Sequence, residues 1–355
     1  MRTFLIFSFL LFFSQLQARK ISTFYGDFDV QEPAFLAVIY SEPVTRLKGV
    51  NQYGTVAQFY EYHYDRYEHS VGVAVLLRMF GASLTEQVAG LLHDVSHTVF
   101  SHVGDHLFDA WQDGSFVEKK DAYQDKHHAW LLAQWGVDRI LAPYGFLLED
   151  ILHKGGNFLM LEQDLPDICA DRLEYILYGA YLEKKLTRNE VQHILRHIQY
   201  ENGVWFFDSV EAARLLGDAS LYLTEHVFGT VQDALVYRWT ARSLEHAVSI
   251  GLLSFNDIHY AQDKNVWNVL SASKDARIQS LVKCICNVGH HYELSSDGQE
   301  YDLHIRTKFR GVDPMVQTAQ GLRRLTVLNG DYCDEYERVR DAFAKGFKVR
   351  LINAE

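Results

Sequence analysis

The segment SLTEQVAGLLHD, residues 83–94, carries a strong signal for the fold. Ser83 and Glu86 stand three residues apart, which is the spacing of a capping box at the start of a helix. Apolar residues then recur at helical spacing between residues 88 and 92, which predicts a helix with one buried face. We expect this helix to run into the adjacent pair His93-Asp94, so that two side chains able to bind a metal ion lie together at its end.

Helices are also predicted on both sides of this stretch. Upstream, apolar residues recur at helical spacing and end at Gly81, a typical residue just after a helix. Downstream, Leu165–Tyr181 carries an apolar face with the helical period. That face consists of Leu165, Ile168, Cys169, Leu173, Ile176 and Leu177. Asp171 and two tyrosines form a second stripe, so we expect this helix to lie between the core and a polar pocket.

The composition favours a mainly α fold. The chain has 355 residues, of which 48% are hydrophobic and only 5 are proline, and so few helix breakers are typical of a helical protein. Beyond Phe255, alternating residues in Tyr292–Leu294 and Tyr301–Phe309 flank an Asp-Gly turn and predict a β-hairpin, while Phe347–Ile352 predicts a further strand. We therefore expect a helical core domain over residues 19–255 and a small C-terminal α+β subdomain over residues 256–355.

Residues 1–18 are typical of a secretory signal peptide. Arg2 supplies a positive charge, residues 5–13 are apolar apart from Ser8, and the small residue Ala18 precedes Arg19. The apolar run is shorter than the roughly 20 residues that a membrane-spanning helix needs. The sequence predicts a secreted or periplasmic protein that is cleaved after Ala18 and has no membrane contact afterwards.

Histidine and aspartate side chains are crowded between residues 63 and 128. They are His63, His69, His93, Asp94, His97, His102, Asp105, His106, His127 and His128. Imidazole nitrogens and carboxylate oxygens together suit one divalent ion, such as Mn, Fe, Zn, Co, Ni or Mg. The formal net charge of −12 argues against nucleic acid as a partner. The sequence contains no zinc-peptidase helix motif, no serine-hydrolase elbow and no P-loop.

Four ordered motifs carry a resemblance to a known family. They are RLKGVNQYG at residues 46–54, RYEHSVGV at residues 66–73, HDVSHTVFSH at residues 93–102 and DRLEY at residues 171–175. Together they resemble the HD-domain metal-dependent phosphohydrolases. Within that family they are most similar to the deoxynucleoside-triphosphate triphosphohydrolase branch, which is sterile-alpha-motif-and-HD-domain-like. The resemblance covers roughly residues 40 to 255.

The resemblance implies a metal-binding set and a catalytic set of side chains. The implied metal ligands are His69, His93, Asp94 and Asp171. Two imidazoles and two carboxylates would balance a divalent ion and leave positions open for water and a phosphate oxygen. The implied phosphate-contacting and proton-handling residues are His97, His102, Asp105 and one of His127 and His128. Among these, His102 and His127 are the candidates for a general acid acting on the leaving oxygen.

The same motifs also imply a set of substrate contacts. The cations available for phosphate oxygens are Arg46, Lys48, Arg66 and Arg172, and arginine suits a two-pronged phosphate contact better than lysine. Tyr175 is expected to meet the sugar or the base, and Gln52 the sugar. The sequence departs from the branch in two places. Gly179 stands where the branch often has an acid, and residues 227–242 lack its histidine and arginine pattern, with Val231 and Leu235 in those places.

The sequence therefore predicts a metal-dependent phosphohydrolase that cleaves a phosphoester or phosphoanhydride of a small molecule, expected to be a nucleotide, through a metal-activated water. The alternative is a catalytically inactive HD-fold module that binds a nucleotide or a metal. Members of the family often assemble into dimers or tetramers, so the resemblance is compatible with a homo-oligomer.

Overall fold

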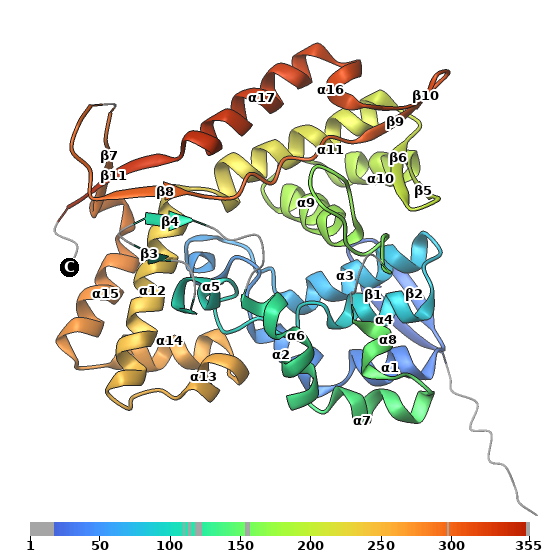
Figure 1. The fold of residues 1–355 in the computed structure, drawn as a ribbon. Helices are drawn as coiled ribbons and strands as arrows, with labels where there is room; N and C mark the ends of the chain where they lie inside the picture. Colours follow the sequence, from blue (N-terminus) through green and yellow to red (C-terminus); the bar gives the residue numbers. More distant parts are fainter. Residues whose placement is uncertain are drawn as a thin grey trace, which may run out of the picture.

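A computed structural model describes residues 18–108, 111–112, 115–117, 123–152, 157–296 and 298–352, the two short pieces at 111–112 and 115–117 by their backbone only (Figure 1). Residues 1–17 of the predicted signal peptide lie outside the described residues. The first described strand, β1, begins at Arg19, directly after the predicted cleavage position. No helix in the described parts of the chain has both the length and the apolar character needed to cross a bilayer.

The predicted mainly helical fold is confirmed. The N-terminal part of the chain supplies β1 (Arg19–Thr23), β2 (Gly26–Val30), α1 (Pro33–Ile39), α2 (Glu42–Arg46), a 3-10 helix (Gly54–Phe59), α3 (Arg66–Met79), α4 (Leu84–Leu92) and α5 (Val103–Phe108). The middle supplies β3 (Trp111–Gln112), β4 (Ser115–Val117), α6 (Tyr123–Gln134), α7 (Val137–Leu141), α8 (Leu148–Ile151), α9 (Ala170–Leu182), α10 (Arg188–His197), β5 (Ile198–Glu201), β6 (Val204–Phe207) and α11 (Val210–Leu223).

The remaining elements follow a short π-helical turn at Thr224–Phe228. They are α12 (Val231–Ser249), α13 (Phe255–Tyr260), α14 (Asp263–Ala272), α15 (Ala276–Cys286), β7 (Tyr292–Leu294), β8 (Leu303–Arg306), β9 (Met315–Thr318), β10 (Gly321–Arg324), α16 (Leu325–Leu328), α17 (Gly330–Lys345) and β11 (Phe347–Leu351). In Figure 1, α12 to α15 lie together at the lower left, and α17 lies above α11.

The centre of the helical body is α3, which packs against α4 on one side and α9 on the other. Leu76, Leu77 and Leu91 are fully buried there and belong to the largest hydrophobic cluster. The helices α3 and α4 each begin at a residue whose side chain caps the helix, Asp65 for α3 and Ser83 for α4. Asp65 and Glu68 form a reciprocal capping box at the start of α3.

The predicted capping box at Ser83 forms only in part. The Ser83 side chain accepts a hydrogen bond from the backbone N–H of Glu86, as expected. The Glu86 carboxylate instead accepts hydrogen bonds from the N–H groups of Met160 and Leu161, both at 3.0 Å. The cap therefore ties α4 to the segment that leads into α9.

The predicted start of the helix containing Asp171 is wrong. The helix begins at Ala170, so Leu165 and Ile168 precede it. Pro166 has no N–H to donate and restricts the residue before it to extended backbone, which keeps this segment out of the helix. Asp171 consequently lies in the first turn of α9, where its position is fixed by the helix start.

The predicted hairpin between Tyr292–Leu294 and Tyr301–Phe309 is also wrong. β7 and β8 lie in one five-stranded sheet, in the order β3-β4-β8-β11-β7, and β11 lies between them. The fully buried Val349 of β11 stands opposite Leu303 of β8 and opposite Leu294 of β7. Between β7 and β8, β11 forms backbone hydrogen bonds along both of its edges. If β7 and β8 paired directly as a hairpin, β11 could have only one of them as a neighbour. The predicted strand at 347–352 is confirmed as β11.

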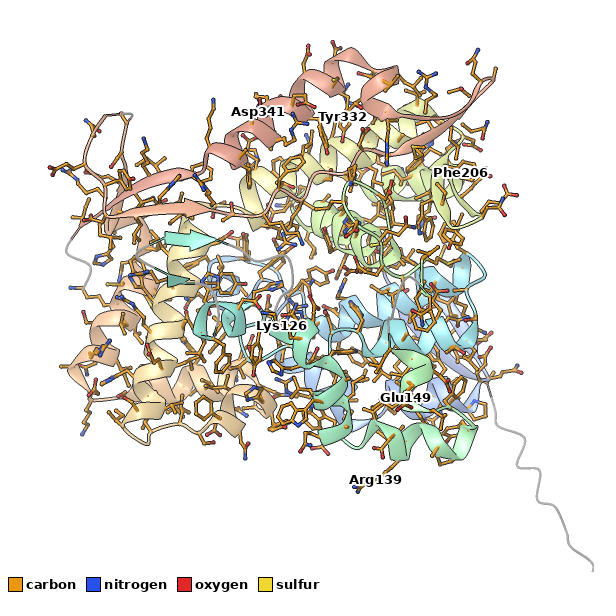
Figure 2. The ribbon with its side chains drawn as sticks, viewed as in Figure 1. Lys126, Arg139, Glu149, Phe206, Tyr332 and Asp341 are labelled. Carbon is orange, nitrogen blue, oxygen red and sulfur yellow. The ribbon has the colours of Figure 1, made fainter. Side chains whose placement is uncertain are left out.

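Strands from both sides of residue 255 share sheets. β4 pairs in parallel with β8, and β6 pairs in parallel with β9 in the four-stranded sheet β10-β9-β6-β5. On α17, the buried Tyr332 side chain faces α11 (Figure 2), where a Cβ added to Gly217 would meet the Tyr332 ring at 2.7 Å. The C-terminal hundred residues are thereby anchored on the helical body.

Candidate metal centre and active-site cavity

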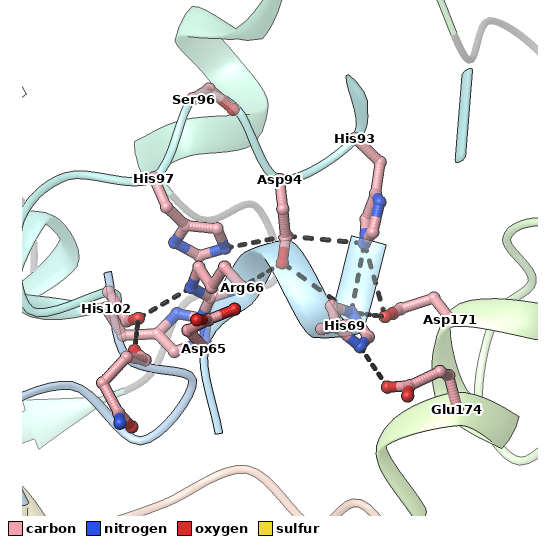
Figure 3. Close-up of polar contacts among 12 residues, drawn as sticks. Asp65, Arg66, His69, His93, Asp94, Ser96, His97, His102, Asp171 and Glu174 are labelled. Carbon is pink, nitrogen blue, oxygen red and sulfur yellow. Dashed lines mark hydrogen bonds and ion pairs between the residues drawn. The ribbon is translucent and has the colours of Figure 1, made fainter. Parts of the chain in front are cut away.

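Three elements bring the four predicted metal ligands together (Figure 3). His69 comes from the first turns of α3, His93 and Asp94 follow the end of α4, and Asp171 comes from the first turn of α9. His69 Nε2 lies 2.9 Å from Asp171 Oδ1 and 3.2 Å from His93 Nε2. The Asp94 carboxylate lies 3.7 Å from His69 Nε2 and 3.5 Å from His93 Nε2.

The donor atoms of this cluster fit a divalent cation. The Nδ1–H of His93 donates to the Gly90 carbonyl at 2.7 Å, and His69 Nδ1 lies 2.5 Å from Glu174 Oε2. Both Nε2 atoms therefore face the same point beside two carboxylates, which is a common arrangement around a bound transition metal. Three of the ligands, His69, His93 and Asp171, have donor atoms within 4.8 Å of one another.

The electrostatics of the cluster favour positive charge at this point. Burial opposes protonation of His69, but Asp171, Glu174 and Asp94 outweigh it and raise its pKa to about 10. The two histidines hold the pKa of Asp171 far below its usual range, although burial acts in the opposite direction. The two imidazoles and two carboxylates would hold a divalent ion at this point, and a proton would fill part of this role without one.

A buried network behind His69 fixes the orientation of its ring. Glu174, which is only 1% exposed, also accepts hydrogen bonds from the hydroxyl groups of Tyr64 and Tyr25. Tyr25 reaches it from the turn between β1 and β2, so the N-terminal hairpin contributes to the metal centre. The sequence assigned no role to Glu174. Its position one turn after Asp171 in the same helix was the available signal.

Arg66 connects the metal centre to the cavity. Its Nη1 donates to Asp94 at 2.6 Å and its Nε donates to Ser101 at 2.7 Å. The side chain is 2% exposed, and its Nη2 makes no hydrogen bond within the described residues although it borders the cavity. An arginine held in this way presents a fixed N–H group to an incoming anion.

A row of histidines continues from Asp94 along the segment between α4 and α5. His97 Nε2 lies 3.2 Å from Asp94 Oδ1, and the His97 and His102 rings meet edge to face at 4.9 Å. His102 Nδ1 lies 3.2 Å from Asp105 Oδ2. Burial and the nearby Arg66 lower the pKa of His97 to about 3, so this ring is neutral. Burial opposes the ionisation of Asp105, but His102 lowers its pKa to about 2.

His127 and His128 differ in position. His128 lines the cavity and its Nδ1 lies 2.9 Å from the Ser96 hydroxyl. Burial lowers the pKa of His128 to about 4, with a contribution from His93. His127 is not among the cavity-lining residues, and its ring lies 4.5 Å from that of Tyr123.

The predicted substrate contacts divide in the same way. Gln52, Arg66, Arg172 and Tyr175 line the cavity. Arg46 does not, because its guanidinium donates to the carbonyl groups of His97 and Ala261 and holds the histidine segment from behind. Lys48 does not either, since its ammonium group lies 4.4 Å from the centre of the Tyr67 ring. These two predicted substrate contacts therefore lie outside the lining of the cavity.

The cavity has a volume of about 1010 Å³ and extends well beyond the predicted residues. Lining residues that the sequence did not single out include Tyr53, Tyr60, Phe228, Asp233, Tyr237, Lys308 and Arg310. Asp233 and Tyr237 stand one turn apart on α12, a spacing that could have indicated a shared polar face. Lys308 and Arg310 follow β8 and carry no local signal, because only the tertiary structure brings them to the cavity.

Comparisons with known proteins agree with this geometry. Residues 66–133 match the HD domain family. The chain is 34% identical over 284 residues to the uncharacterized protein YdhJ of Bacillus subtilis, covering 79% of this chain and 82% of that protein. It is 30% identical over 299 residues to the metal-dependent phosphohydrolase cns2 of Cordyceps militaris, covering 82% of this chain and 83% of that one.

Solved structures share the fold. A phosphohydrolase from Bacteroides thetaiotaomicron superimposes with a TM-score of 0.65 at 14% identity, over 88% of this chain and 95% of that one. A hypothetical protein from Aquifex aeolicus does so with a TM-score of 0.67 at 17% identity, over 92% and 99%. The fold and the site define an HD-domain hydrolase. The chain belongs to the HD-domain family of metal-dependent phosphohydrolases, and it is a metal-dependent enzyme of that class.

Proposed function

We propose that this enzyme hydrolyses a phosphoester or phosphoanhydride bond of a nucleotide. The observation that carries the proposal is that one cavity contains the histidine and aspartate cluster, an arginine with an unpartnered N–H group, and a set of aromatic rings. We expect a phosphate group to lie at the histidine and aspartate cluster and the arginine, and a base or sugar to lie against the aromatic rings. The volume of the cavity, about 1010 Å³, is at the upper end of the range typical of small-molecule sites.

His69, His93, Asp94 and Asp171 would hold the metal ion. When bound, such an ion supplies a Lewis acid beside the phosphate and lowers the pKa of water. Arg66 donates through Nη2 to a phosphate oxygen, while its bonds to Asp94 and Ser101 keep the guanidinium in place. These contacts position the phosphorus centre against the ligand cluster.

His102 is the residue best arranged to protonate the leaving oxygen. Asp105 is ionised at neutral pH, because its pKa is about 2, and it accepts a hydrogen bond from His102 Nδ1–H. This contact fixes the ring orientation and directs Nε2 away from Asp105, toward the position proposed for the leaving oxygen. The neutral His97 and His128 contribute polar contacts nearby.

The surroundings of Gly179 differ from the pattern of the triphosphohydrolase branch. A Cβ placed on Gly179 would lie 3.1 Å from the Tyr53 hydroxyl, so Tyr53 occupies the space that the acid of that branch would need. Release of tripolyphosphate from a deoxynucleoside triphosphate remains the specific form of the proposal, with release of orthophosphate or opening of a diester as the other outcomes.

The test combines metal analysis with a panel of nucleoside mono-, di- and triphosphates and cyclic esters, run on the wild type and on Asp94→Ala. We expect metal-dependent turnover of at least one nucleotide by the wild type, and loss of both bound metal and turnover in the variant. Mass spectrometry of the products identifies the bond that is cut. Turnover that survives Asp94→Ala would remove the proposal.

A further inference from the structure

The part of the cavity next to α12 is lined by connected aromatic rings, which we call the aromatic end. It consists of Tyr53, Tyr60, Tyr175, Phe228 and Tyr237. The ring of Tyr53 lies 5.2 Å from that of Tyr60 and 5.6 Å from that of Phe228, and Phe228 meets Tyr175 edge to face at 5.5 Å. The Tyr237 ring is stacked on the His106 ring at 5.1 Å with an interplanar angle of 20°. The aromatic end therefore offers flat π surfaces to a planar ligand.

One carboxyl group lies among these rings. Asp233 is in the first turn of α12, is 7% exposed and lines the cavity. In the described parts of the chain no ion pair joins it to a lysine, arginine or histidine. Its charge acts instead on the hydroxyl groups of Tyr60 and Tyr237, whose pKa values burial and then Asp233 raise. Burial raises the pKa of Asp233 to about 7, and hydrogen bonds from Thr230 offset this only in part.

A buried carboxyl without a cation is stabilised further when a ligand adds hydrogen-bond donors to those of Thr230. A ligand that fits the aromatic end must also be flat and unsaturated, because stacking requires a π face. An amino-bearing nucleobase combines both properties. Replacing its amino group by an oxo group turns the donor into an acceptor, which would leave an oxygen of the ionised Asp233 carboxylate facing a second acceptor oxygen.

We propose that the aromatic end of the cavity is a nucleobase subsite, in which Asp233 accepts a hydrogen bond from the amino group of the base and so discriminates amino-bearing bases from their oxo counterparts. The proposal rests on the proposed nucleotide substrate and adds that the enzyme recognises the amino group of the base. Asp233 would act as a specificity residue and would take no part in the cleavage step.

The experiment compares nucleotides that differ only at this group, adenosine with inosine and cytidine with uridine, at the phosphorylation level that the enzyme hydrolyses. For the wild type we expect KM to be at least about tenfold higher for the oxo member of each pair, with little change in kcat. In Asp233→Asn the ratio is expected to fall close to one, because an amide can turn either its N–H or its oxygen toward the base.

Asp313→Asn is the matched control. Asp313 is also 7% exposed, but its carboxylate accepts hydrogen bonds from the backbone N–H and the hydroxyl of Thr326, and it does not line the cavity. This variant tests the general effect of losing a buried carboxylate, and it is expected to keep the wild-type ratio. A ratio near one in the wild type, or a ratio that persists in Asp233→Asn, overturns the proposal.

Three further measurements separate this proposal from the proposed function and from another ligand class. Hydrolysis of ribose 5-phosphate, which has no base, together with equal KM values for the amino and oxo nucleotides, would leave the phosphohydrolase in place and remove the base subsite. If no nucleotide is turned over, calorimetric dissociation constants of the same pairs on wild type and Asp233→Asn give the same ratio directly. Preference for phosphocholine over every nucleotide would assign the rings to an alkylammonium group and overturn the proposal.

Discussion

Glu174 and Asp171 hold opposite edges of one imidazole ring: Glu174 Oε2 lies 2.5 Å from Nδ1 of His69, and Asp171 Oδ1 lies 2.9 Å from its Nε2. Both acids come from the first turns of α9, one helical turn apart. The ring therefore cannot rotate without breaking a buried contact on one side or the other. Such carboxylate–histidine pairs set the orientation and basicity of metal ligands.

We predict that Glu174→Gln weakens metal binding about 10- to 100-fold, because the amide holds His69 less firmly and lowers its basicity. Calorimetric titration of the metal-free protein with Mn²⁺ or Zn²⁺ measures the effect. Glu183→Gln is the control, since Glu183 also accepts a hydrogen bond from a tyrosine, Tyr62, but is not among the cavity-lining residues. Equal affinities of Glu174→Gln and the wild type would contradict the assignment of Glu174 as a positioning residue.

Arg66→Ala should destabilise the metal-free protein by about 3–5 kcal/mol, because it leaves the buried carboxylate of Asp94 without its partner at 2.6 Å. Urea unfolding of the metal-free protein measures this loss. Arg338→Ala serves for comparison, since Arg338 is half exposed and its pairs with Glu225 and Glu335 lie at the surface. That substitution is expected to cost less than about 1 kcal/mol. Similar losses in the two variants would show that Arg66 is not held as a buried pair.

The stability of the protein should depend on the ionisation of Asp233. Burial raises its folded pKa to about 7, above the usual value near 4, so the native state binds this proton more tightly than the unfolded state does. Its contribution to stability is present at low pH and is lost as the pH rises toward 7. Asp233→Asn removes this dependence. As the pH rises from 5 to 8, the unfolding free energy of the variant should therefore increase by roughly 1–3 kcal/mol relative to that of the wild type. Parallel pH profiles of the unfolding free energy would contradict this prediction.

The two adjacent histidines of α6 should differ in importance. His128 faces the cavity and contacts Ser96, whereas His127 is not among the cavity-lining residues. We expect His128→Ala to lower kcat/KM at least about tenfold and His127→Ala to change it by less than about twofold. The reverse order of effects would mean that the helix turns its other face to the substrate.

We also propose that the chain is exported and cleaved after Ala18. The described structure begins its first strand at Arg19, so cleavage there would leave β1 complete. Intact mass and N-terminal sequencing of protein expressed with its full leader should give a mature chain that starts at Arg19, found in the secreted or periplasmic fraction. Recovery of the uncleaved chain in the cytosolic fraction would remove this proposal.

Much of the metal centre could be predicted from the sequence, because each ligand lies in or directly beside a helix. A helix forms by hydrogen bonds between residues four apart, so residues close together in the sequence determine its apolar face, its cap and its end. His69, His93, Asp94 and Asp171 could be recognised from such local patterns and from motifs matched to the family. The same reasoning failed at Leu165, where the local period continued but Pro166 prevented the helix.

The sequence could not show which of the predicted substrate contacts line the cavity, because a charged side chain near a motif can point either way. Arg46 and Lys48 share a motif with Gln52, yet only Gln52 reaches the cavity. Arg46 is directed to the carbonyl groups of His97 and Ala261, and Ala261 lies more than two hundred residues away in the chain. No local pattern contains that information.

The helical class follows from the sequence alone, because helical periodicity is local, and the resemblance of four short motifs to a known family predicts the metal ligands. The three-dimensional structure was needed to show that β11 lies between β7 and β8 and that Glu174 contacts His69. It also shows that Asp233, Lys308 and Arg310 line the same cavity as the predicted metal ligands. The physical reason is that sheet order and cavity walls arise from contacts between distant segments. Their free energy depends on what is buried together, which short-range periodicity does not encode.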